Sequence, residues 1–272
     1  MQQQVIHLTK HQGLGNDFLV LLESQNPTIV VDASDAIRWC DRHRGIGADG
    51  LIWVRTAHQD DIDADMVLFN SDGSLAEISG NGIRCLGQAL LRSRGHRDGT
   101  LQIHTAAGVR ELVSVPTSRP NEDQLSVSMG EIEPIEVDID AVRSAAAPVS
   151  VDKIGAASVG NPHIVIATKS IDAIDLDKIG PAVESIFRDG MNVHLIEASG
   201  PSTLLARHWE RGAGITLACG SGATVAATLA SAWGLVSGPV KVSMPGGVAV
   251  VDVETGILTG PSEFIANCEV WR

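Results

Sequence analysis

The sequence contains no tyrosine and few lysines, and both shortages narrow the chemistry open to it. Without tyrosine, no phenol can serve as an acid, a base or a radical carrier. No lysine lies in a recognisable cofactor motif, which argues against a pyridoxal Schiff base. We therefore expect no cofactor. The lysines are Lys10, Lys153, Lys169, Lys178 and Lys241.

Cysteine is also scarce, and its spacing argues against a structural metal site. Cys40, Cys85, Cys219 and Cys268 form no C-x-x-C pair, so we expect no bound zinc. In a reducing compartment these residues are free thiols rather than disulfides.

The chain also has no excess of basic charge and no long apolar run. The formal net charge is -13 and the pI is near 5.0, so the chain repels phosphate backbones and we expect no nucleic-acid partner. The longest mostly apolar run, from Ala223 to Val236, is too short to span a bilayer. The N-terminus lacks the basic and apolar regions of a signal peptide. We expect a cytoplasmic protein that does not enter the membrane.

Short β-rich runs dominate the chain and are broken by Gly, Asn, Asp and Pro, which predicts a strand-rich α/β (α+β) fold. Three segments predict helices, and the last two are apolar around most of their circumference, so they should be buried within sheets. The predicted helices are Ser34–Arg44, Gly80–Arg94 and Gly220–Trp233. The clearest predicted strands are Phe18–Leu22, Leu51–Arg55, Met66–Phe69, Leu101–Thr105, Val109–Val115, His163–Ala167, Val240–Met244 and Gly247–Val253.

An internal repeat indicates two similar domains. Gly-Asn pairs at 15–16 and 160–161 each open an apolar strand, 145 residues apart. Ser79-Gly-Asn-Gly82 and Cys219-Gly-Ser-Gly222 each open an apolar helix, 140 residues apart. Such offsets are too long for a solenoid and fit two domains related by approximate two-fold symmetry. The polar, Pro-containing segment 116–123 is the candidate linker between residues 1–118 and 119–261.

Gly45-Ile-Gly-Ala-Asp-Gly50 matches the dinucleotide pattern G-x-G-x-x-G, but its context is wrong. A dinucleotide fingerprint follows a strand and opens a helix. Here a predicted helix precedes the motif and a predicted strand follows it, so we interpret it as a turn.

Cys219 stands immediately before a predicted helix. The first turn of a helix has unpaired N–H groups and the positive end of the dipole, which lower the pKa of a cysteine and can bind a carboxylate. The alternative is a buried, inert cysteine in a tight turn. The repeat favours function, because two helix starts facing one cleft would place Ser79 and Cys219 on opposite sides of one substrate atom. That geometry suits removal of a proton from one face of a stereocentre and its return to the other.

At these residues the sequence resembles the diaminopimelate epimerases, within the wider group that includes the proline racemases. The resemblance covers nearly the whole chain. Its motifs are Gly13-Leu-Gly-Asn-Asp-Phe18, Arg42-His-Arg-Gly-Ile-Gly-Ala-Asp49, Asn70-Ser-Asp-Gly-Ser74, Ala76-Glu-Ile-Ser-Gly-Asn-Gly-Ile-Arg84, Gly160-Asn-Pro-His163, Glu210-Arg-Gly-Ala-Gly214 and Ala218-Cys-Gly-Ser-Gly222.

The resemblance implies two pseudo-symmetric domains, each a curved, mostly antiparallel sheet around a central apolar helix, with the active site between them. It implies that residues 262–272 return to the first domain. It also implies an isomerase that works without pyridoxal or metal and interconverts LL- and meso-2,6-diaminoheptanedioate on the lysine and cell-wall route. We further expect a homodimer.

The resemblance also assigns roles to individual residues. The acid/base positions of the family fall on Cys219 and on Ser79, where a cysteine would be expected. The family's cradle for the α-carboxylate falls on Gly80, Asn81, Gly220 and Ser221. Its contacts to the distal end of the substrate fall on Asn16, Asn70, Asn161, Asn192 and Arg211, and Glu210 and His163 match supporting residues.

Ser79 departs from the family, because a serine alkoxide is not populated at neutral pH without a strong base beside it. Three explanations stay open: an introduced Cys→Ser change, a native serine assisted by water or a neighbour, or drift to a related reaction that needs one thiolate. Two rival functions follow. One is another cofactor-independent amino-acid racemase, isomerase or dehydratase, and the other is a non-catalytic amino-acid-binding protein.

Overall fold

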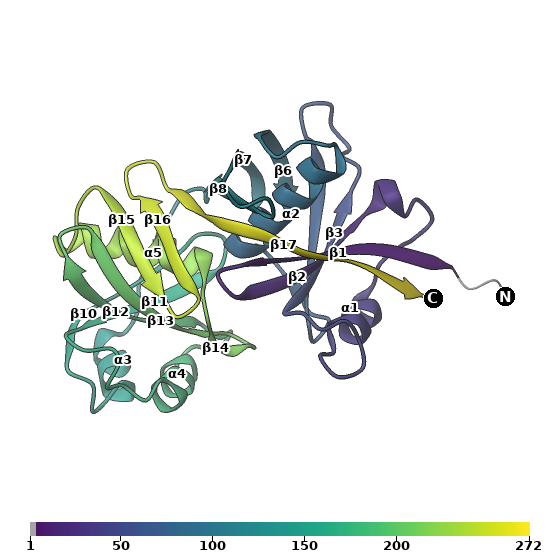
Figure 1. The fold of residues 1–272 in the computed structure, drawn as a ribbon. Helices are drawn as coiled ribbons and strands as arrows, with labels where there is room; N and C mark the ends of the chain where they lie inside the picture. Colours follow the sequence, from purple (N-terminus) through teal and green to yellow (C-terminus); the bar gives the residue numbers. More distant parts are fainter. Residues whose placement is uncertain (1–3) are drawn as a thin grey trace. The chain divides into compact units, whose positions relative to one another are not determined.

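The computed structural model describes residues 4–272, which divide into two compact units (Figure 1). Unit 1 comprises the chain up to Val127 together with Gly260–Arg272, and unit 2 comprises Ser128–Thr259. The described residues hold five α-helices and many more strands, so the fold is α+β, as predicted.

Unit 1 begins with two antiparallel strands and then encloses a long helix. Its last strand comes from the C-terminus, because residues 263–271 of β17 pair antiparallel with β1. The elements are β1 (Val5–Gly13), β2 (Asn16–Leu22), α1 (Ala33–Cys40), β3 (Gly50–Arg55), β4 (Ala64–Asn70), β5 (Leu75–Ala76), α2 (Gly80–Ser93), β6 (Gly99–Thr105), β7 (Gly108–Pro116), β8 (Glu122–Ser128) and β17 (Ile257–Trp271).

Unit 2 has the same plan and one helix more than unit 1. Its elements are β9 (Glu133–Ile135), α3 (Ile139–Ala145), β10 (Val151–Ser158), β11 (Pro162–Thr168), α4 (Leu176–Glu184), β12 (Asn192–Gly200), β13 (Thr203–Glu210), β14 (Gly214–Thr216), α5 (Gly220–Ala232), β15 (Pro239–Met244), β16 (Gly247–Asp252) and the first residues of β17.

The strand pairings of the two units match one for one. In unit 1, β1–β2 is antiparallel, β2–β3 parallel, β3–β4 and β4–β5 antiparallel, β4–β6 parallel and β6–β7 antiparallel. In unit 2, β10–β11, β11–β12, β12–β13, β13–β14, β13–β15 and β15–β16 follow the same sequence of senses. The internal repeat read from the sequence is therefore a repeat of topology.

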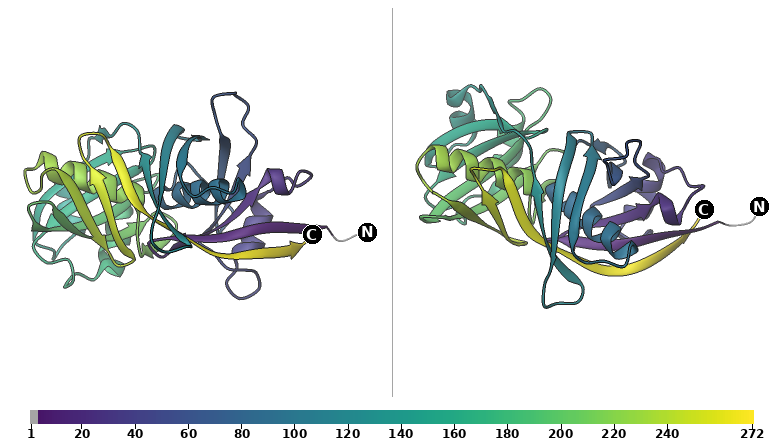
Figure 2. Two further views of the ribbon diagram at one scale, coloured as in Figure 1. Left: turned by 45° about the horizontal axis from the view of Figure 1, so that its top comes forward. Right: turned by 90° about the horizontal axis from the view of Figure 1, so that it is seen from above.

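Each unit encloses one buried helix, as predicted from the apolar character of the two segments. In α2, every residue from Gly80 to Leu91 is buried. In α5, the run Gly220–Ala227 is buried, and Figure 2 shows this helix lying among the strands of unit 2. Successive side chains on the strands of unit 2 alternate between the two faces of the sheet. On one face, Ile164, Ile166, Val193 and Leu195 pack with α3 and α4 in one apolar cluster. Period-two alternation then turns the intervening residues toward α5.

Some local predictions were wrong. The helix expected over Ser34–Arg44 ends at Cys40, because Asp41 turns to an extended ψ of 118° and its carboxylate accepts the N–H groups of His43 and Arg44. The segment 116–123, expected to be a linker, is the turn between the paired strands β7 and β8 of unit 1. Helices α3 and α4 were not predicted.

The interpretation of Gly45–Gly50 as a turn is confirmed. The segment follows α1 and leads into β3, which begins at Gly50. At Gly47 the backbone has φ +82°, where a side chain would be strained.

Among residues 4–272, no helix is long and apolar enough to cross a membrane.

Candidate active site

Ser79 and Cys219 hold equivalent positions at the starts of α2 and α5. Ser79 has φ -135° and ψ 118°, and Cys219 has φ -129° and ψ 111°. The Ser79 Oγ accepts the N–H of Gly82 at 3.0 Å, and the Cys219 Sγ accepts the N–H of Gly222 at 3.3 Å. Each side chain is therefore an N-cap that takes one of the N–H groups a helix start leaves unpaired.

The surroundings of Cys219 oppose the lowered pKa that its place at a helix start predicts. The residue is only 3% exposed. Burial raises the pKa of the thiol well above its ordinary value, and the nearby Glu210 carboxylate raises it further as a negative charge and hydrogen-bond partner. Hydrogen bonds from Ser221 and from the Gly222 N–H lower it, but by less. Cys219 is a protonated thiol in this state, placed to donate a proton.

Glu210 is fixed by its own neighbours. It ends β13, where it pairs with Gly214 of β14, and its Oε1 accepts the hydroxyl of Thr216 at 2.6 Å. The Ser221 hydroxyl lies 3.6 Å from the Cys219 Sγ and belongs to the first turn of α5. Unit 2 thus brings together four residues predicted for the site: Glu210, Cys219, Gly220 and Ser221.

The other predicted residues of unit 2 form an adjoining network. Asn161 Oδ1 lies 2.8 Å from His163 Nε2. His163 and Asn192 are register partners on the parallel strands β11 and β12. Asn192 Oδ1 accepts the backbone N–H of Arg211 at 3.0 Å, and the Asn192 amide donates to the Pro162 carbonyl. The Arg211 guanidinium donates to the Asp189 carbonyl at 3.0 Å, and Arg211 is exposed.

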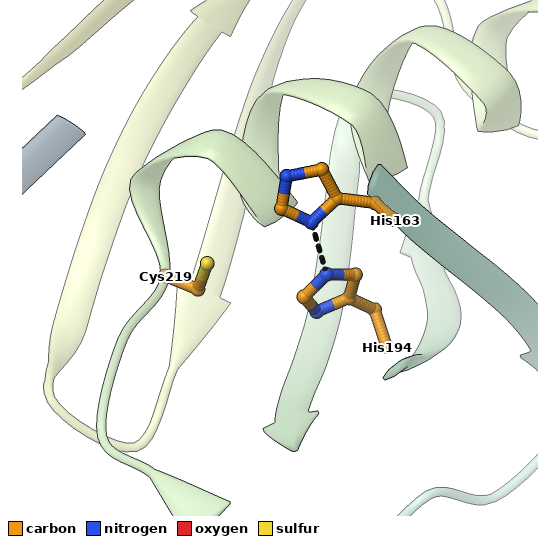
Figure 3. Close-up of side chains that lie close together, drawn as sticks. All are labelled: His163, His194 and Cys219. Carbon is orange, nitrogen blue, oxygen red and sulfur yellow. Dashed lines mark hydrogen bonds between the residues drawn. The ribbon is translucent and has the colours of Figure 1, made fainter. Parts of the chain in front are cut away.

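Two histidines that the sequence analysis missed extend this network (Figure 3). His163 Nδ1 lies 2.8 Å from His194 Nε2, and His194 Nδ1 lies 2.7 Å from His208 Nδ1. All three rings are fully buried. Burial lowers the pKa of His163 and of His208 to about 3 and that of His194 well below 6.5. The rings are therefore neutral imidazoles.

In unit 1, the start of α2 carries a second network. Ser79 is half-buried, whereas Gly80 and Asn81 are buried. The Asn81 amide donates to Asn16 Oδ1 at 3.2 Å, and Asn81 Oδ1 accepts from the Arg84 guanidinium at 2.8 Å. Arg84 also donates to the Gly80 carbonyl at 2.9 Å, so this buried arginine holds the first turn in place.

Charged residues orient Asn16, and the sequence analysis did not identify them. The Asn16 amide donates to Asp49 Oδ2 at 2.7 Å. Arg42 bridges Asp49 and Asp17 at 2.7 Å each, and Lys10 lies 2.9 Å from Asp17. Burial raises the pKa of Asp17, but hydrogen bonds and charge from Arg42 and Lys10 outweigh it, so the net pKa is lowered. Arg42 and Asp49 lie in a motif that carried the resemblance, which was the available signal.

Asn70 lies at the turn between β4 and β5. Its amide donates to the Ser74 hydroxyl at 3.0 Å, and its backbone N–H donates to the Ser74 carbonyl. Ser71 is next to it and donates its backbone N–H to the carbonyl of Asp49, the residue whose carboxylate holds Asn16. Asn70 is therefore the sequence neighbour of a residue that contacts the Asn16 network.

The two helix starts define a chemistry. Each offers backbone N–H groups suited to a carboxylate, and each carries a side chain with an exchangeable proton at the N-cap. In unit 2 that side chain is a thiol with a carboxylate beside it. This set suits proton transfer at a carbon next to a carboxylate.

Solved structures with the same fold include epimerases. A protein described as a "Predicted Epimerase" from Pseudomonas aeruginosa matches with a TM-score of 0.77 at 16% identity, covering 97% of this chain and 99% of that one. A hydroxyproline epimerase from Agrobacterium vitis, with bound trans-4-hydroxy-L-proline, matches with a TM-score of 0.69 at 14% identity, covering 98% and 92%. At these identities the match establishes the fold alone, one that known epimerases share.

Sequence comparison gives the family. The model of the diaminopimelate epimerases matches residues 8–134 and 155–264. The diaminopimelate epimerase of Microcystis aeruginosa is 39% identical over 256 residues, covering 89% of each chain. That of Ectopseudomonas mendocina is 36% identical over 281 residues, covering 98% of this chain and 99% of the relative. The chain belongs to the diaminopimelate epimerase family and is an isomerase.

Proposed function

We propose that the protein interconverts LL- and meso-2,6-diaminoheptanedioate by proton transfer at the α-carbon, with Cys219 and Ser79 as its two acid/base positions. The observation that carries this proposal is the repeated helix start. Two units of matching topology present equivalent N-cap side chains, with backbone torsions that differ by only a few degrees. Inversion of a stereocentre requires a proton donor on one face and an acceptor on the other, and the repeat supplies two such positions.

The N–H groups at the start of each helix would bind the α-carboxylate. They belong to Gly80 and Asn81 in unit 1 and to Gly220 and Ser221 in unit 2. Negative charge builds up on this carboxylate as the α-proton leaves, so N–H groups aimed at it stabilise the transition state more than the bound substrate.

Cys219 acts in the proposal as the donor in one direction and the acceptor in the other. As a thiol it donates its proton to the α-carbon, leaving a thiolate. To accept the α-proton, Cys219 must first lose its own proton, and the Glu210 carboxylate beside it is the group positioned to take it. His163 and Glu210 are positioning residues in this scheme.

Recognition of the distal end explains the remaining residues. The amide oxygens of Asn16, Asn70, Asn161 and Asn192 suit an ammonium group, and the guanidinium of Arg211 suits a carboxylate. A substrate with an ammonium group and a carboxylate at each end would contact both the asparagines and Arg211. The family to which the chain belongs also supports this substrate. The two relatives described above are both named diaminopimelate epimerase. We further propose that the protein acts in lysine and cell-wall precursor synthesis, in the cytoplasm, as a homodimer without cofactor.

Conversion of LL-diaminopimelate to the meso form, followed by chiral chromatography, tests the proposal. We expect meso product from the wild-type protein and none above background from Cys219→Ala. Trans-4-hydroxy-L-proline and L-proline serve as competing substrates. Turnover of either of these in place of diaminopimelate would refute the substrate assignment.

A second function is favoured by one observation. In the described part of the chain, the Ser79 hydroxyl accepts a hydrogen bond from the Gly82 N–H. This N–H is a donor and cannot take the proton of the hydroxyl. A serine without a base is a poor proton acceptor. The alternative is an isomerisation or elimination on an amino acid that uses Cys219 alone. Loss of water or a double-bond shift, without α-inversion, would identify it.

A further inference from the structure

The thiol of Cys219 and the rings of His163 and His194 converge in unit 2 (Figure 3). One ligand atom from each lies within 4.8 Å of the others. Gly222 connects the thiol to His194: its N–H donates to Cys219 Sγ, and a Cβ added there would lie 2.7 Å from His194 Nε2. Two imidazoles and a thiolate are the ligands that Zn²⁺ prefers.

We propose that Cys219, His163 and His194 form a binding site for Zn²⁺ or a similar thiophilic divalent ion, which occupies the thiol and switches the enzyme off. The site goes beyond the acid/base function. Its inhibitory effect rests on the proposed role of Cys219, whereas metal binding itself does not.

The separation of the two ring nitrogens is close to that in a zinc site. Two nitrogens bound to one tetrahedral zinc at about 2.0–2.1 Å lie about 3.3 Å apart. His163 Nδ1 and His194 Nε2 are now 2.8 Å apart, joined by a hydrogen bond. To hold the ion, the two nitrogens must move apart by about half an ångström and both rings must turn toward a common point beside the present hydrogen bond. Three protein ligands leave a fourth position for water, the arrangement of an open zinc site.

The protons of the histidine chain can rearrange to free both nitrogens. Because His163 Nε2 donates to Asn161 Oδ1, His163 Nδ1 carries a lone pair and His194 Nε2 donates to it. His208 Nδ1 then donates to His194 Nδ1. When the metal takes His194 Nε2, the His194 proton moves to its Nδ1, and the His208 proton moves to Nε2.

His208 is the residue that makes this shift possible. Its Nε2 is buried and has no hydrogen-bond partner within the described residues. It can therefore receive the displaced proton without breaking another hydrogen bond. The imidazoles lose no net proton, and the thiol releases one to solvent as the metal–sulfur bond forms. After the shift, each ligating ring donates its second N–H to an acceptor, as metal-bound histidines usually do.

The test uses the reduced, full-length protein and two probes. Zn²⁺ titrated by calorimetry should bind at one ion per chain. Co²⁺ should give a thiolate-to-metal charge-transfer band, which reports cysteine coordination directly. We expect that band to vanish in Cys219→Ala and to persist in Cys268→Ala, the control at another free cysteine. Zn²⁺ binding to Cys219→Ala as tight as to the wild type would overturn the proposal.

Variants of the histidines separate the ligands from their support. His194→Phe keeps a ring beside Gly222 and should weaken Zn²⁺ binding by more than a hundredfold. His194→Gln is the second variant if the first fails to fold. His208→Phe should weaken binding about 10- to 100-fold, the usual effect of losing a partner of a ligand. Unchanged affinity in both His194 variants would remove His194 from the site.

Activity is measured separately on the same samples. Wild-type turnover of diaminopimelate should fall as Zn²⁺ is added and return with a chelator. Metal binding without any diaminopimelate turnover in metal-free protein would contradict the proposed function and leave the metal site standing. Full activity with the charge-transfer band saturated would contradict inhibition.

Discussion

Replacing Ser79 by cysteine should restore a second acid/base thiol. The substitution changes one atom at an N-cap whose backbone torsions already match those of Cys219. The Ser79 Oγ lies 3.0 Å from the Gly82 nitrogen and the Cys219 Sγ lies 3.3 Å from the Gly222 nitrogen, so the longer contact of sulfur is accommodated at the equivalent site. We expect no change in the fold of α2.

The new thiol should ionise more readily than Cys219. Ser79 is half-buried, whereas Cys219 is 3% exposed and has the Glu210 carboxylate beside it. A less desolvated thiol at a helix N-terminus has a lowered pKa. One thiolate and one thiol would then be present together, which is the pair that inversion requires. General acid–base catalysis contributes about 10²–10⁴-fold, so epimerisation should rise at least about 100-fold, or about 2.7 kcal/mol in activation free energy.

The assay is the rate of conversion between LL- and meso-diaminopimelate for Ser79→Cys against wild type. Ser93→Cys is the matched control, because it makes the same change at the last residue of α2, where the helix dipole disfavours a thiolate. It should leave the rate unchanged. A folded Ser79→Cys protein with no faster epimerisation would refute the reasoning and favour a reaction that uses Cys219 alone.

Three further predictions follow from the structure. Arg211→Ala should weaken diaminopimelate binding by about 1.5–3 kcal/mol in calorimetry, and much less for an analogue without the distal carboxylate; equal losses would make Arg211 structural. Gly222→Ala should lower the free energy of unfolding by about 1–3 kcal/mol in urea, because its Cβ would lie 2.7 Å from His194 Nε2, whereas Gly87→Ala faces flexible leucine side chains and should cost less. Burial lowers the pKa of His11 from 6.5 to about 4. The contribution of His11 to stability is therefore present above pH 6.5, and about 3 kcal/mol of it is lost as the pH falls toward 4. His11→Gln should flatten this part of the pH profile of the free energy of unfolding in urea.

Local pattern was enough to predict the two buried helices and their N-caps. The segments that became α2 and α5 are apolar around most of their circumference and start at Gly-rich turns, so their burial and starting points follow from the chain itself. The repeat of these motifs also anticipated the matching topology of the two units.

Features that depend on tertiary packing were missed. The helix start alone predicts a lowered pKa for Cys219, but burial and Glu210 raise this pKa and are stronger. His194 and His208 were missed because they meet only through the register of β12 and β13. The turn at 116–123 was taken for a linker because a polar composition suits both a turn and a linker between domains. Only the pairing of β7 with β8 distinguishes the two.

Hydrogen exchange at the α-carbon tests the central claim most directly. LL- and meso-diaminopimelate are incubated separately with the wild-type protein in D₂O, and the α-proton signal and stereochemistry are followed by NMR. The account predicts that one configuration exchanges its α-hydrogen faster than it inverts, that the opposite configuration exchanges very slowly, and that Cys219→Ala abolishes both. Absence of exchange from both isomers, or exchange that survives in Cys219→Ala, would contradict it.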